Sequence, residues 1–369
     1  MKFSCEKYLL QNACSTAARA AASKSPILAL EGLLLEAGAD VKVTGYDLKK
    51  GIYTSFAADV AQGGAIVVNS RLFGEIIRKL PDGIVTVATD NLNINVKCGK
   101  SDFNIMGLSP DDYPEMPVVD EQKQITLSEK TLRSMINQTI FAVADNDVRP
   151  IYTGTLFEIC EDELTLVSVD GYRLAKRSEK LGETYEDICR FVVPGAALSD
   201  IERICEDSDD PVSIAVGQKH ISFSIGETVV VSRRLEGEFL NYKKSIPESF
   251  RHILKVERSE FMAVIDRVSL IISEKNSSPV HLFLNDGNIE CSCITPIGKA
   301  EDVCLCEGNG EGMEIGFNDR YLMDALKAAG KDELLLCLNT ASSPCILKAA
   351  DESDAFTYMI LPVRLRTGD

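Results

Sequence analysis

Four cysteines come closest, by residue type and spacing, to a metal site. They are Cys291, Cys293, Cys304 and Cys306, which could be drawn as a four-sulfur zinc site on a hairpin. Cys-x-Cys is not the usual zinc-knuckle spacing, however, and Cys291 and Cys293 continue an alternation that begins at Ile289. We therefore interpret them as small buried hydrophobes, and no metal site is predicted.

Other catalytic patterns are weak. The three histidines, His220, His252 and His281, are spread over predicted strands without the spacing of a metal pair, and no serine stands in a nucleophile elbow. The glycine-rich run 308–312 lacks the Lys-Ser/Thr of a phosphate loop, so we expect a flexible loop between strands. With 56 acidic residues, neighbouring carboxylates say little about acid and base catalysis. The chain is not predicted to be an enzyme, and no cofactor is predicted.

One segment has residues suited to binding a partner. In the run 167–176 a strand leads into Asp170-Gly171, turns, and leaves as a second strand. The turn exposes Tyr172 beside Arg173 and Leu174, a mixture common in binding hot spots. A plain hairpin explains the pattern equally well.

The C-terminal run Tyr358–Leu365 is a second candidate. It is strongly apolar, and Pro362 bars it from regular central pairing, so its end is expected at a sheet edge or bulge. Apolar tails that end at an edge often line a groove, although a last core strand would have the same sequence.

The elements that must position these segments repeat three times. Amphipathic helices are predicted to begin near residues 6, 70, 129, 196, 260 and 319, so corresponding helices recur about every 125 residues. In each copy a helix, a run of strands, a second helix and more strands follow one another. The pattern predicts an α+β protein of three tandem domains, 1–122, 123–247 and 248–369, of the usual domain size.

Local signals support these elements. The second helix has Asn69 as its expected N-cap and Pro81 beyond its end, with inward Leu72, Phe73, Ile76, Ile77 and Leu80. The sixth has Asn318 as cap and Gly330 as terminator. Alternation at 91–98 and 221–225 predicts strands with one dry face. Helices are therefore expected on one face of antiparallel sheets.

Composition limits the class of protein. With 45% hydrophobic and 26% charged residues the chain can fold, and no stretch reaches the ~18 apolar residues that span a membrane. The twelve cysteines are scattered, which favours reduced thiols and a cytoplasmic location. The net charge of −17 argues against general nucleic-acid affinity. Basic residues gather on outward helix positions, but ordinary solvated faces explain them too, since Glu75 and Asp200 lie on the same helices.

Several runs, in order over the whole chain, resemble a known family. They are Ser25–Leu28, Arg149–Glu158, Val169–Ala175, Phe239–Tyr242, Gly316–Asn318 and Leu361–Leu365. The chain resembles the bacterial DNA polymerase III beta subunit, the beta sliding clamp. The resemblance implies a DNA sliding clamp: a head-to-tail homodimer of three-domain protomers, a closed ring with helices around the hole. Such a ring encircles double-stranded DNA and makes the polymerase processive. The acidic charge then fits, because topology holds the DNA and sliding needs only weak phosphate contacts.

The resemblance also implies a groove that binds short hydrophobic motifs of the DNA polymerase III alpha subunit, the clamp loader, other polymerases and repair proteins. Its wall would comprise Tyr152, Val169, Gly171, Tyr172, Arg173, Leu174, Leu240, Lys244, Asn318, Tyr321, Ser343, Met359, Ile360, Leu361, Pro362, Val363 and Arg364. The chain departs from the family at Leu240, where Pro is common, and at Lys244, where Arg is common. Leu361 and Val363 stand where some members have Met, which keeps the pocket apolar but makes it stiffer.

For DNA, the resemblance points to Lys24 and Arg149, with helix-borne Arg71, Arg78, Lys79 and Arg203 as further candidates. Lys24 replaces an Arg of many relatives, which keeps the charge without bidentate geometry. For the homodimer interface, apolar Phe103 and Met106 in the first domain and Ile271 and Ile272 in the third are predicted, although either isoleucine also suits a helix core.

Two alternatives remain from the residues alone. A peptide-binding scaffold protein without DNA encirclement could share the groove and the acidic surface, and it would be favoured by a stable monomer. A hydrolase with paired carboxylates would be favoured by a metal-dependent activity lost on mutation of one acid.

Overall fold

The computed structural model describes residues 1–120, 123–145, 149–273, 278–351 and 355–364. The chain forms two compact units, the first from 1–133 and 196–234, the second from 134–195 and 235–369. The boundary between the two units divides the second of the three repeats.

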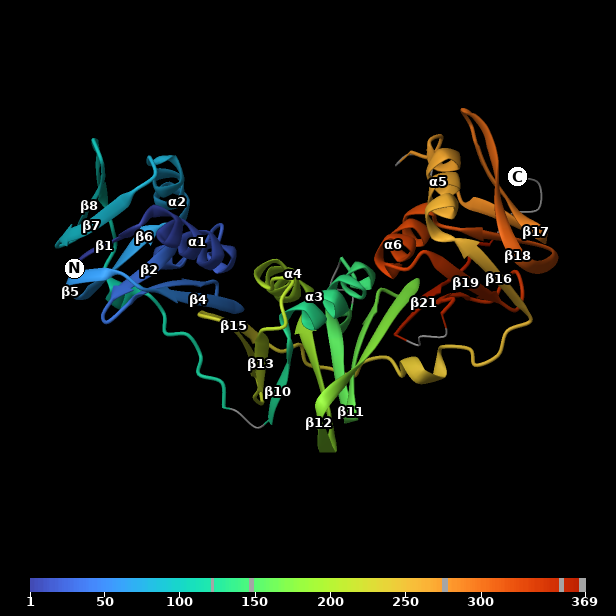
Figure 1. The fold of residues 1–369 in the computed structure, drawn as a ribbon, viewed down its shortest axis with the longest axis horizontal. Coiled ribbons are helices and arrows are strands. Elements are labelled where there is room, and N and C mark those ends of the chain that lie inside the picture. The colour runs from blue at the N-terminus through green and yellow to red at the C-terminus, as the bar shows by residue number, and fades with distance from the viewer. Residues whose placement is uncertain (121–122, 146–148, 274–277, 352–354, 365–369) are drawn as a thin grey trace. The chain divides into compact units, whose positions relative to one another are not determined.

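The helices begin within two residues of the predicted positions (Figure 1). In the described residues they are α1 (Lys7–Ala17), α2 (Ser70–Lys79), α3 (Glu129–Asn137), α4 (Gly195–Ile204), α5 (Arg258–Ser269) and α6 (Asp319–Ala329). Short 3₁₀ turns follow α1 and α3, at η1 (Ala18–Ala20) and η4 (Ile140–Ala142). No helix among the described residues is long and apolar enough to cross a membrane.

The first unit contains two sheets. One has the strand order β5-β1-β7-β8-β9, and the other has the order β10-β13-β14-β15-β4-β3-β2-β6. Their strands are β1 (Lys2–Glu6), β2 (Gly32–Ala37), β3 (Val41–Tyr46), β4 (Lys50–Phe56), β5 (Asp59–Gln62), β6 (Gly64–Asn69), β7 (Ile84–Asp90), β8 (Asn93–Cys98), β9 (Ser101–Met106), β10 (Lys123–Ser128), β13 (Pro211–Val216), β14 (His220–Ile225) and β15 (Thr228–Arg233).

The described residues of the second unit form one sheet, in the order β11-β12-β21-β20-β19-β16-β18-β17. Its strands are β11 (Gly154–Val169), β12 (Arg173–Pro194), β16 (His252–Glu257), β17 (Val280–Thr295), β18 (Gly298–Phe317), β19 (Glu333–Leu338), β20 (Cys345–Ala349) and β21 (Phe356–Ile360). The strand pairs in both units are antiparallel, as expected.

The predicted helix caps are confirmed. Asn69 Oδ1 accepts a hydrogen bond from Leu72 N at 2.9 Å, and Asn318 Oδ1 accepts one from Tyr321 N at 3.2 Å. Gly330 ends α6 with φ +63°, a conformation that favours glycine. The inward position of Leu72 was wrong, because its side chain is 49% exposed while Phe73 and Ile77 are buried.

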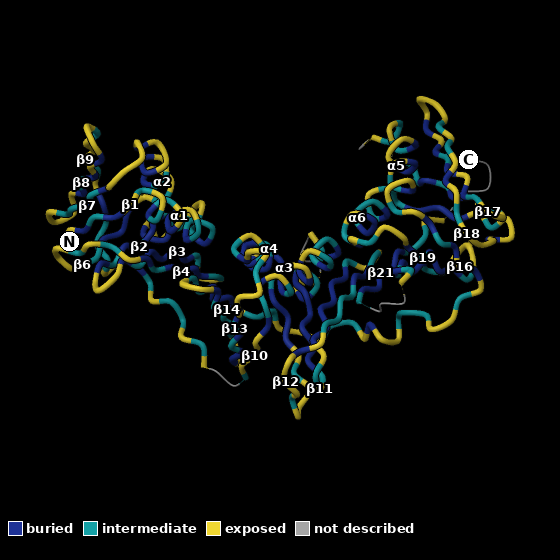
Figure 2. The backbone as a smooth tube through the Cα atoms, viewed as in Figure 1, coloured by how far each residue is buried: buried dark blue, intermediate teal, exposed yellow. Residues whose placement is uncertain are grey.

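Buried residues, dark blue in Figure 2, occur in the strands and helices of both units and form apolar cores. In the first unit, Leu10 of α1 and Phe73 of α2 pack with strand residues such as Phe3 and Leu35 in one buried cluster. In the second, Phe261 of α5 and Leu322 of α6 belong to a corresponding cluster. Burial of these apolar faces stabilises the helices more than their intrinsic propensity does.

The glycine-rich run is a strand and not the expected loop. Residues 308–312 lie within β18, and a side chain at Gly310 would stand 2.2 Å from Leu284 Cβ. Gly308 and Gly312 have φ +117° and +71° at a point where the β17–β18 register shifts. Glycine therefore permits a bulge and a close backbone approach, which single-sequence patterns do not distinguish from a loop.

Each repeat closes with the same backbone contact. An isolated antiparallel bridge joins the segment before the second helix to the segment after the last strand: Val67 with Leu108, Val192 with Leu235, and Gly316 with Val363. The C-terminal segment is thus the counterpart of the linkers that end the first two repeats.

Successive repeats are joined by a strand pair and by an ion pair. In the first unit β4 pairs with β15, and Lys50 Nζ contacts the carboxylate of Asp200, which is 6% exposed, on α4. Arg19 approaches the same carboxylate at 3.9 Å. In the second unit β12 pairs with β21, and Arg173 contacts Asp324 on α6 at 2.6 Å. In both units the acid is the sixth residue of its helix.

We expect Asp200→Asn to lower the free energy of unfolding by about 2–4 kcal/mol, because Lys50 would lose the counter-charge of a buried pair. Urea unfolding of the full chain measures the effect. Asp209→Asn, an exposed carboxylate after α4, is the matched control and should change stability by no more than about 0.5 kcal/mol. Equal midpoints for Asp200→Asn and the unchanged chain would contradict the prediction.

Candidate functional site

The hairpin predicted at Asp170-Gly171 is confirmed. Asp170 Oδ1 accepts hydrogen bonds from Tyr172 N at 2.9 Å and Arg173 N at 3.0 Å, and Gly171 has φ +94°. The side chain of Asp170 therefore stabilises the turn by accepting hydrogen bonds from the backbone, and Gly171 adopts the left-handed conformation that the turn requires. Tyr172 is 62% exposed at the tip, as predicted.

Arg173 is enclosed by charged and aromatic groups. Its side chain is 11% exposed; Nε donates to Asp170 Oδ2 at 2.9 Å, and one terminal nitrogen donates to Asp324 Oδ2 at 2.6 Å. The guanidinium also lies 4.5 Å from the ring centre of Tyr321 and 5.5 Å from that of Phe141. Arg173 thus fixes the hairpin to α6.

Two tyrosines extend this arrangement to the surface. The rings of Tyr172 and Tyr321 stack with centroids 6.0 Å apart and an interplanar angle of 24°. Burial, reinforced by the Asp170 carboxylate, raises the pKa of Tyr321, so its hydroxyl stays protonated and can donate a hydrogen bond. Tyr172, Tyr321 and Arg173 form what we call the aromatic platform.

An apolar cluster adjoins the platform along β11, β12 and β21. It brings together five residues of the predicted groove, Tyr152, Val169, Leu174, Leu240 and Met359. Three of them, Val169, Leu174 and Met359, are almost fully buried. These three, which were predicted on the groove wall, therefore lie beneath the surface in this structure. Tyr152, on the turn η5 (Pro150–Thr153), meets Phe239 edge to face at 5.6 Å.

The linker that carries Leu240 is held by a buried carboxylate. Glu158, 2% exposed on β11, accepts a hydrogen bond from the Tyr242 hydroxyl at 2.9 Å. It also pairs with Lys243 at 2.6 Å and Arg190 at 2.5 Å. Burial alone would raise the pKa of Glu158, but hydrogen bonds from Lys243 and Tyr242 outweigh burial and lower it. Lys244, at the end of the turn η6 (Tyr242–Lys244), is exposed.

The C-terminal segment leaves the sheet beside Tyr172. β21 ends at Ile360, which is buried, and Leu361 N donates to Tyr172 O at 2.9 Å. Pro362 follows outside the strand, as predicted, and Val363 is 40% exposed. Arg364 is exposed, and Ser343 is half-buried in the turn between β19 and β20. Leu365 lies outside the described residues.

Four residues of this region were not predicted as site residues: Phe141, Phe239, Tyr242 and Asp324. Phe239 and Tyr242 lie in a segment that carries the family resemblance, which could have identified them. Phe141 and Asp324 had no local signal, because their contacts with Arg173 are long-range.

The six cations predicted to contact DNA are all exposed. Lys24, Arg71, Arg78, Lys79 and Arg203 belong to the first unit and Arg149 to the second. Arg78 pairs with Glu75 at 2.6 Å on α2. Arg203 lines a pocket of about 510 Å³ that also contains Arg19, Glu129 and Glu206. Arg149 stands over the ring of Tyr152 at 5.7 Å.

The four predicted interface residues divide in two. Phe103 and Met106 lie on β9 and are 40% and 66% exposed. Ile271 and Ile272 follow α5, which ends at Ser269, so neither lies within the helix. Both are half-buried, and Ile272 packs against the core of the second unit. Ile272 also lines a pocket of about 240 Å³ with Asn318 and Val363.

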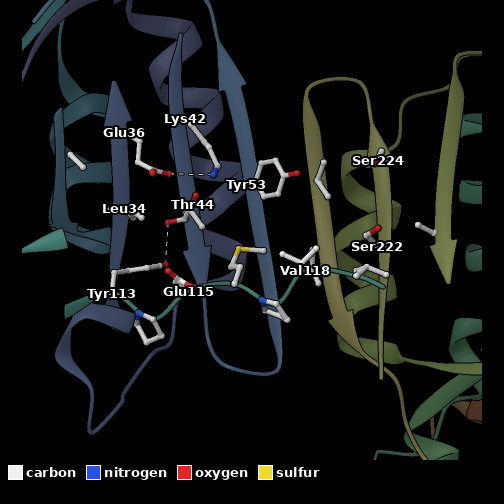
Figure 3. A pocket seen from close by; sticks show the side chains of 18 of the residues that line it. Leu34, Glu36, Lys42, Thr44, Tyr53, Tyr113, Glu115, Val118, Ser222 and Ser224 are labelled. Atoms are coloured by element: carbon white, nitrogen blue, oxygen red, sulfur yellow. Dashed lines mark hydrogen bonds and ion pairs between the residues drawn. The ribbon is translucent and has the colours of Figure 1, made fainter. Parts of the chain in front are cut away.

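A further pocket lies on the first unit. It has a volume of about 1060 Å³ and is lined by β2, β3, β4, β6, β10, β13, β14, β15 and the segment 110–119. Figure 3 shows Lys42 directed at Glu36, 3.3 Å away, and Tyr113 bonded to the Thr44 backbone at 3.2 Å. Lys42 also stands over the ring of Tyr53. No predicted site residue lines this pocket.

The four cysteines lie on β17 and β18. Among the described residues no group of His, Cys, Asp and Glu is arranged to hold a metal ion. Cys291, Cys293 and Cys304 are buried, and burial raises the pKa of all four thiols, that of Cys304 to about 12. Burial favours the protonated thiol. It agrees with the interpretation of Cys291, Cys293 and Cys304 as small buried hydrophobes, whereas Cys306 is only half-buried.

Family models match the chain in three consecutive parts. They are the N-terminal domain of the DNA polymerase III beta subunit at residues 1–117, its central domain at 126–241, and its C-terminal domain at 243–364. The chain belongs to this family. Its members, the beta sliding clamps, are DNA polymerase processivity factors and not enzymes.

Full-length relatives agree. The beta sliding clamp of Staphylococcus epidermidis is 32% identical over 376 aligned residues, which cover 99% of each chain. The DNA polymerase sliding clamp of Bacillus subtilis is 30% identical with a TM-score of 0.95, over 99% of this chain and 100% of that one. A sliding clamp of Pseudomonas aeruginosa bound to griselimycin is 27% identical with a TM-score of 0.94, over the same shares.

Glu158 makes the stability of the clamp depend on pH. Its lowered pKa means that its contribution is present above the unfolded-state value of about 4.5 and is lost as pH falls below it. Glu158→Gln keeps the Tyr242 bond but loses two ion pairs, so we expect a loss of about 1–2 kcal/mol at pH 7 that shrinks at pH 3.5. Thermal unfolding at the two pH values measures this. Glu161→Gln, on the same strand but exposed, is the control.

Proposed function

We propose that two copies of this clamp assemble head to tail into a ring that encircles duplex DNA in the cytoplasm. The observation that carries the proposal is an unused strand edge at each end of the repeat series. Among the described strands, β9 pairs only with β8, and residues 298–305 of β18 pair only with β17. Phe103 and Met106 on β9 and Ile271 and Ile272 near β18 are the proposed interface residues. The domains are proposed as 1–122, 123–247 and 248–369, which the three matched ranges support.

The charge of the chain suits encirclement better than direct binding. A protein with net charge −17 gains little from general phosphate attraction, whereas a closed ring keeps DNA by topology. Weak, sequence-independent contacts then permit sliding. Exposed Lys24, Arg71 and Lys79, with Arg203 and Arg149, are the proposed contacts. Arg78 contributes less, because Glu75 already neutralises it.

The aromatic platform and the adjoining apolar cluster are proposed to bind short hydrophobic peptides of the polymerase alpha subunit, the clamp loader, other polymerases and repair proteins. Tyr172 offers an exposed ring held by Tyr321, and Leu240, Leu361 and Val363 supply apolar contacts. Lys244 and Arg364 are exposed polar anchors. The griselimycin complex of the Pseudomonas relative is consistent with a ligand site on this fold.

Retention on DNA tests encirclement. The clamp is loaded onto nicked circular plasmid with its loader and ATP, separated from free protein in moderately high salt, and half of the sample is linearised. Loss only from linear DNA is expected for a ring. Equal retention on both forms would indicate direct binding, and no retention with an active loader would favour a peptide-binding scaffold.

Lys24→Glu should shorten the half-life on circular DNA several-fold, because an exposed contact becomes repulsive, and leave peptide affinity unchanged. Lys219→Glu, an exposed lysine in the turn between β13 and β14, is the matched control. Equal effects of the two substitutions on retention would remove Lys24 from the DNA contacts.

Tyr172→Ala should weaken binding of a fluorescent peptide from the polymerase alpha subunit at least tenfold, since the platform would lose its exposed ring. Fluorescence anisotropy measures the affinity, and sedimentation should show an unchanged dimer. Ile188→Ala, 61% exposed on β12 away from the platform, is the control. Unchanged affinity of Tyr172→Ala would contradict the groove assignment.

A further inference from the structure

The two junctions between successive repeats have the same register. At the first, β4 and β15 pair from Thr54 with Thr228 to Lys50 with Ser232. At the second, β12 and β21 pair from Arg177 with Phe356 to Arg173 with Ile360. One residue beyond each paired segment, a further backbone hydrogen bond continues the ladder. Arg233 N donates to Lys49 O at the first junction and Leu361 N donates to Tyr172 O at the second, both at 2.9 Å. The junctions are therefore two copies of one arrangement.

The same turn fixes that register in both copies. Asp47 Oδ1 accepts from the amides of Lys49 and Lys50, each at 2.8 Å, as Asp170 does from those of Tyr172 and Arg173. In the third repeat Thr295 takes this position, and its hydroxyl accepts from Ile297 N at 3.4 Å. Thr295 pairs with Gly298 across the turn, as Asp47 pairs with Lys50. Gly298 is thus the counterpart of Lys50 and Arg173.

The isolated bridges identify the corresponding residues on the second strand of each junction. Leu108 is the counterpart of Leu235 and Val363, so Ile105 on β9 corresponds to Ser232 on β15 and Ile360 on β21. Transfer of the common register then pairs β9 of one copy with the start of β18 in another. In that register Ile105 would stand opposite Gly298 and Phe103 opposite Ala300, and Met106 N would donate to Ile297 O.

The side chains at this third junction differ in kind. At the first two junctions, Lys50 or Arg173 binds the sixth residue of the facing helix, which is Asp200 or Asp324. Arg19 or Phe141 lies beside this pair, at the thirteenth position counted from the start of the first helix of the repeat. The third has Gly298 and Leu270 at these positions. Leu270 is 78% exposed. The sixth residue of α2, Glu75, already has its own partner in Arg78.

Exposed apolar residues fill the remaining positions. Ile297 is the counterpart of Tyr172, and Leu72, the third residue of α2, is the counterpart of Tyr321. Tyr172 and Tyr321 stack in the second unit, whereas Ile297 and Leu72 are 73% and 49% exposed in a single chain. Their exposure, which the fold of one chain leaves unexplained, follows if another copy covers them.

We propose that the interface between copies repeats the register of the internal junctions but replaces their ion pair with apolar contacts. Ile297 of one copy packs on Leu72 of the next, and Phe103 lies opposite Ala300. This inference rests on the proposed head-to-tail ring and adds its register and chemistry. The internal junctions are held by charge as well as by backbone bonds, while the junction that closes the ring is held by backbone bonds and apolar area.

The strand carboxylates near this interface already have partners within one copy. Asp102 would stand opposite Glu301, and each already pairs within its own copy, with Lys97 at 3.2 Å and with Lys299. The facing α2 also carries Arg71 and Lys79, both exposed. Two chains of net charge −17 repel one another, and salt screens that repulsion. The dimer should therefore not weaken in high salt.

Cross-linking tests the register. In full-length protein, Phe103→Cys combined with Ala300→Cys should give a covalent dimer on mild oxidation, visible on a non-reducing gel, since directly opposed residues have close Cβ atoms. Phe103→Cys combined with Lys299→Cys, one residue out of register and on the opposite face, is the matched control, with the unchanged chain as a second. Cross-linking of the control pair and not of the test pair would overturn the register while leaving the ring intact.

Sedimentation tests the chemistry. The dimer Kd should stay within threefold, or fall, between 0.05 and 1 M NaCl, and a rise of more than tenfold would overturn the apolar interface. Ile297→Glu should raise Kd at least tenfold, whereas Ile188→Glu, also exposed, should change it less than twofold. Equal melting temperatures exclude misfolding. A chain that stays monomeric at every concentration would instead reject the ring, and with it both parts of the inference.

Discussion

Antiparallel pairing between the strands of successive repeats is the interaction on which the rest of this structure depends. The β4–β15 and β12–β21 pairs join the sheets of neighbouring repeats, and each lies next to an ion pair. A slip of one residue would turn every side chain to the other face, so the register must be fixed. The carboxylates of Asp47 and Asp170 fix it locally, by binding the amides that begin the outgoing strand.

The same junction creates the candidate peptide site. Because Arg173 begins the outgoing strand, its guanidinium reaches Asp324 and the ring of Tyr321, and the turn before it presents Tyr172. The C-terminal segment then passes beside that turn, since Leu361 bonds to the carbonyl of Tyr172. A surface built on hydrogen-bonded strands is held more precisely than one built on free loops. Leu361 and Val363, which are less flexible than methionine, keep this surface apolar with less capacity to adapt.

The basic residues at the internal junctions are paired, whereas other basic residues are exposed. Lys50, Arg19 and Arg173 are engaged by carboxylates at the internal junctions, so they contribute to cohesion within the chain. Lys24 and Arg71 lie exposed. An acidic protein with a few exposed cations suits a partner that is retained by topology, because strong phosphate binding would oppose sliding.

The sequence by itself determined the repeat, the helix starts, the caps at Asn69 and Asn318, and the Asp170-Gly171 hairpin. These follow from local periodicity and from side-chain bonds that span two or three residues. The family resemblance added the groove residues, which lie in one unit. Only the tertiary structure decided which apolar residues are covered. Leu72 is exposed on an otherwise inward helix face, the predicted groove residues Val169 and Leu174 are buried, and the glycines at 308–312 belong to a bulged strand. Such outcomes depend on contacts between residues far apart in the chain, such as Arg173 with Asp324. A local sequence pattern does not specify these contacts.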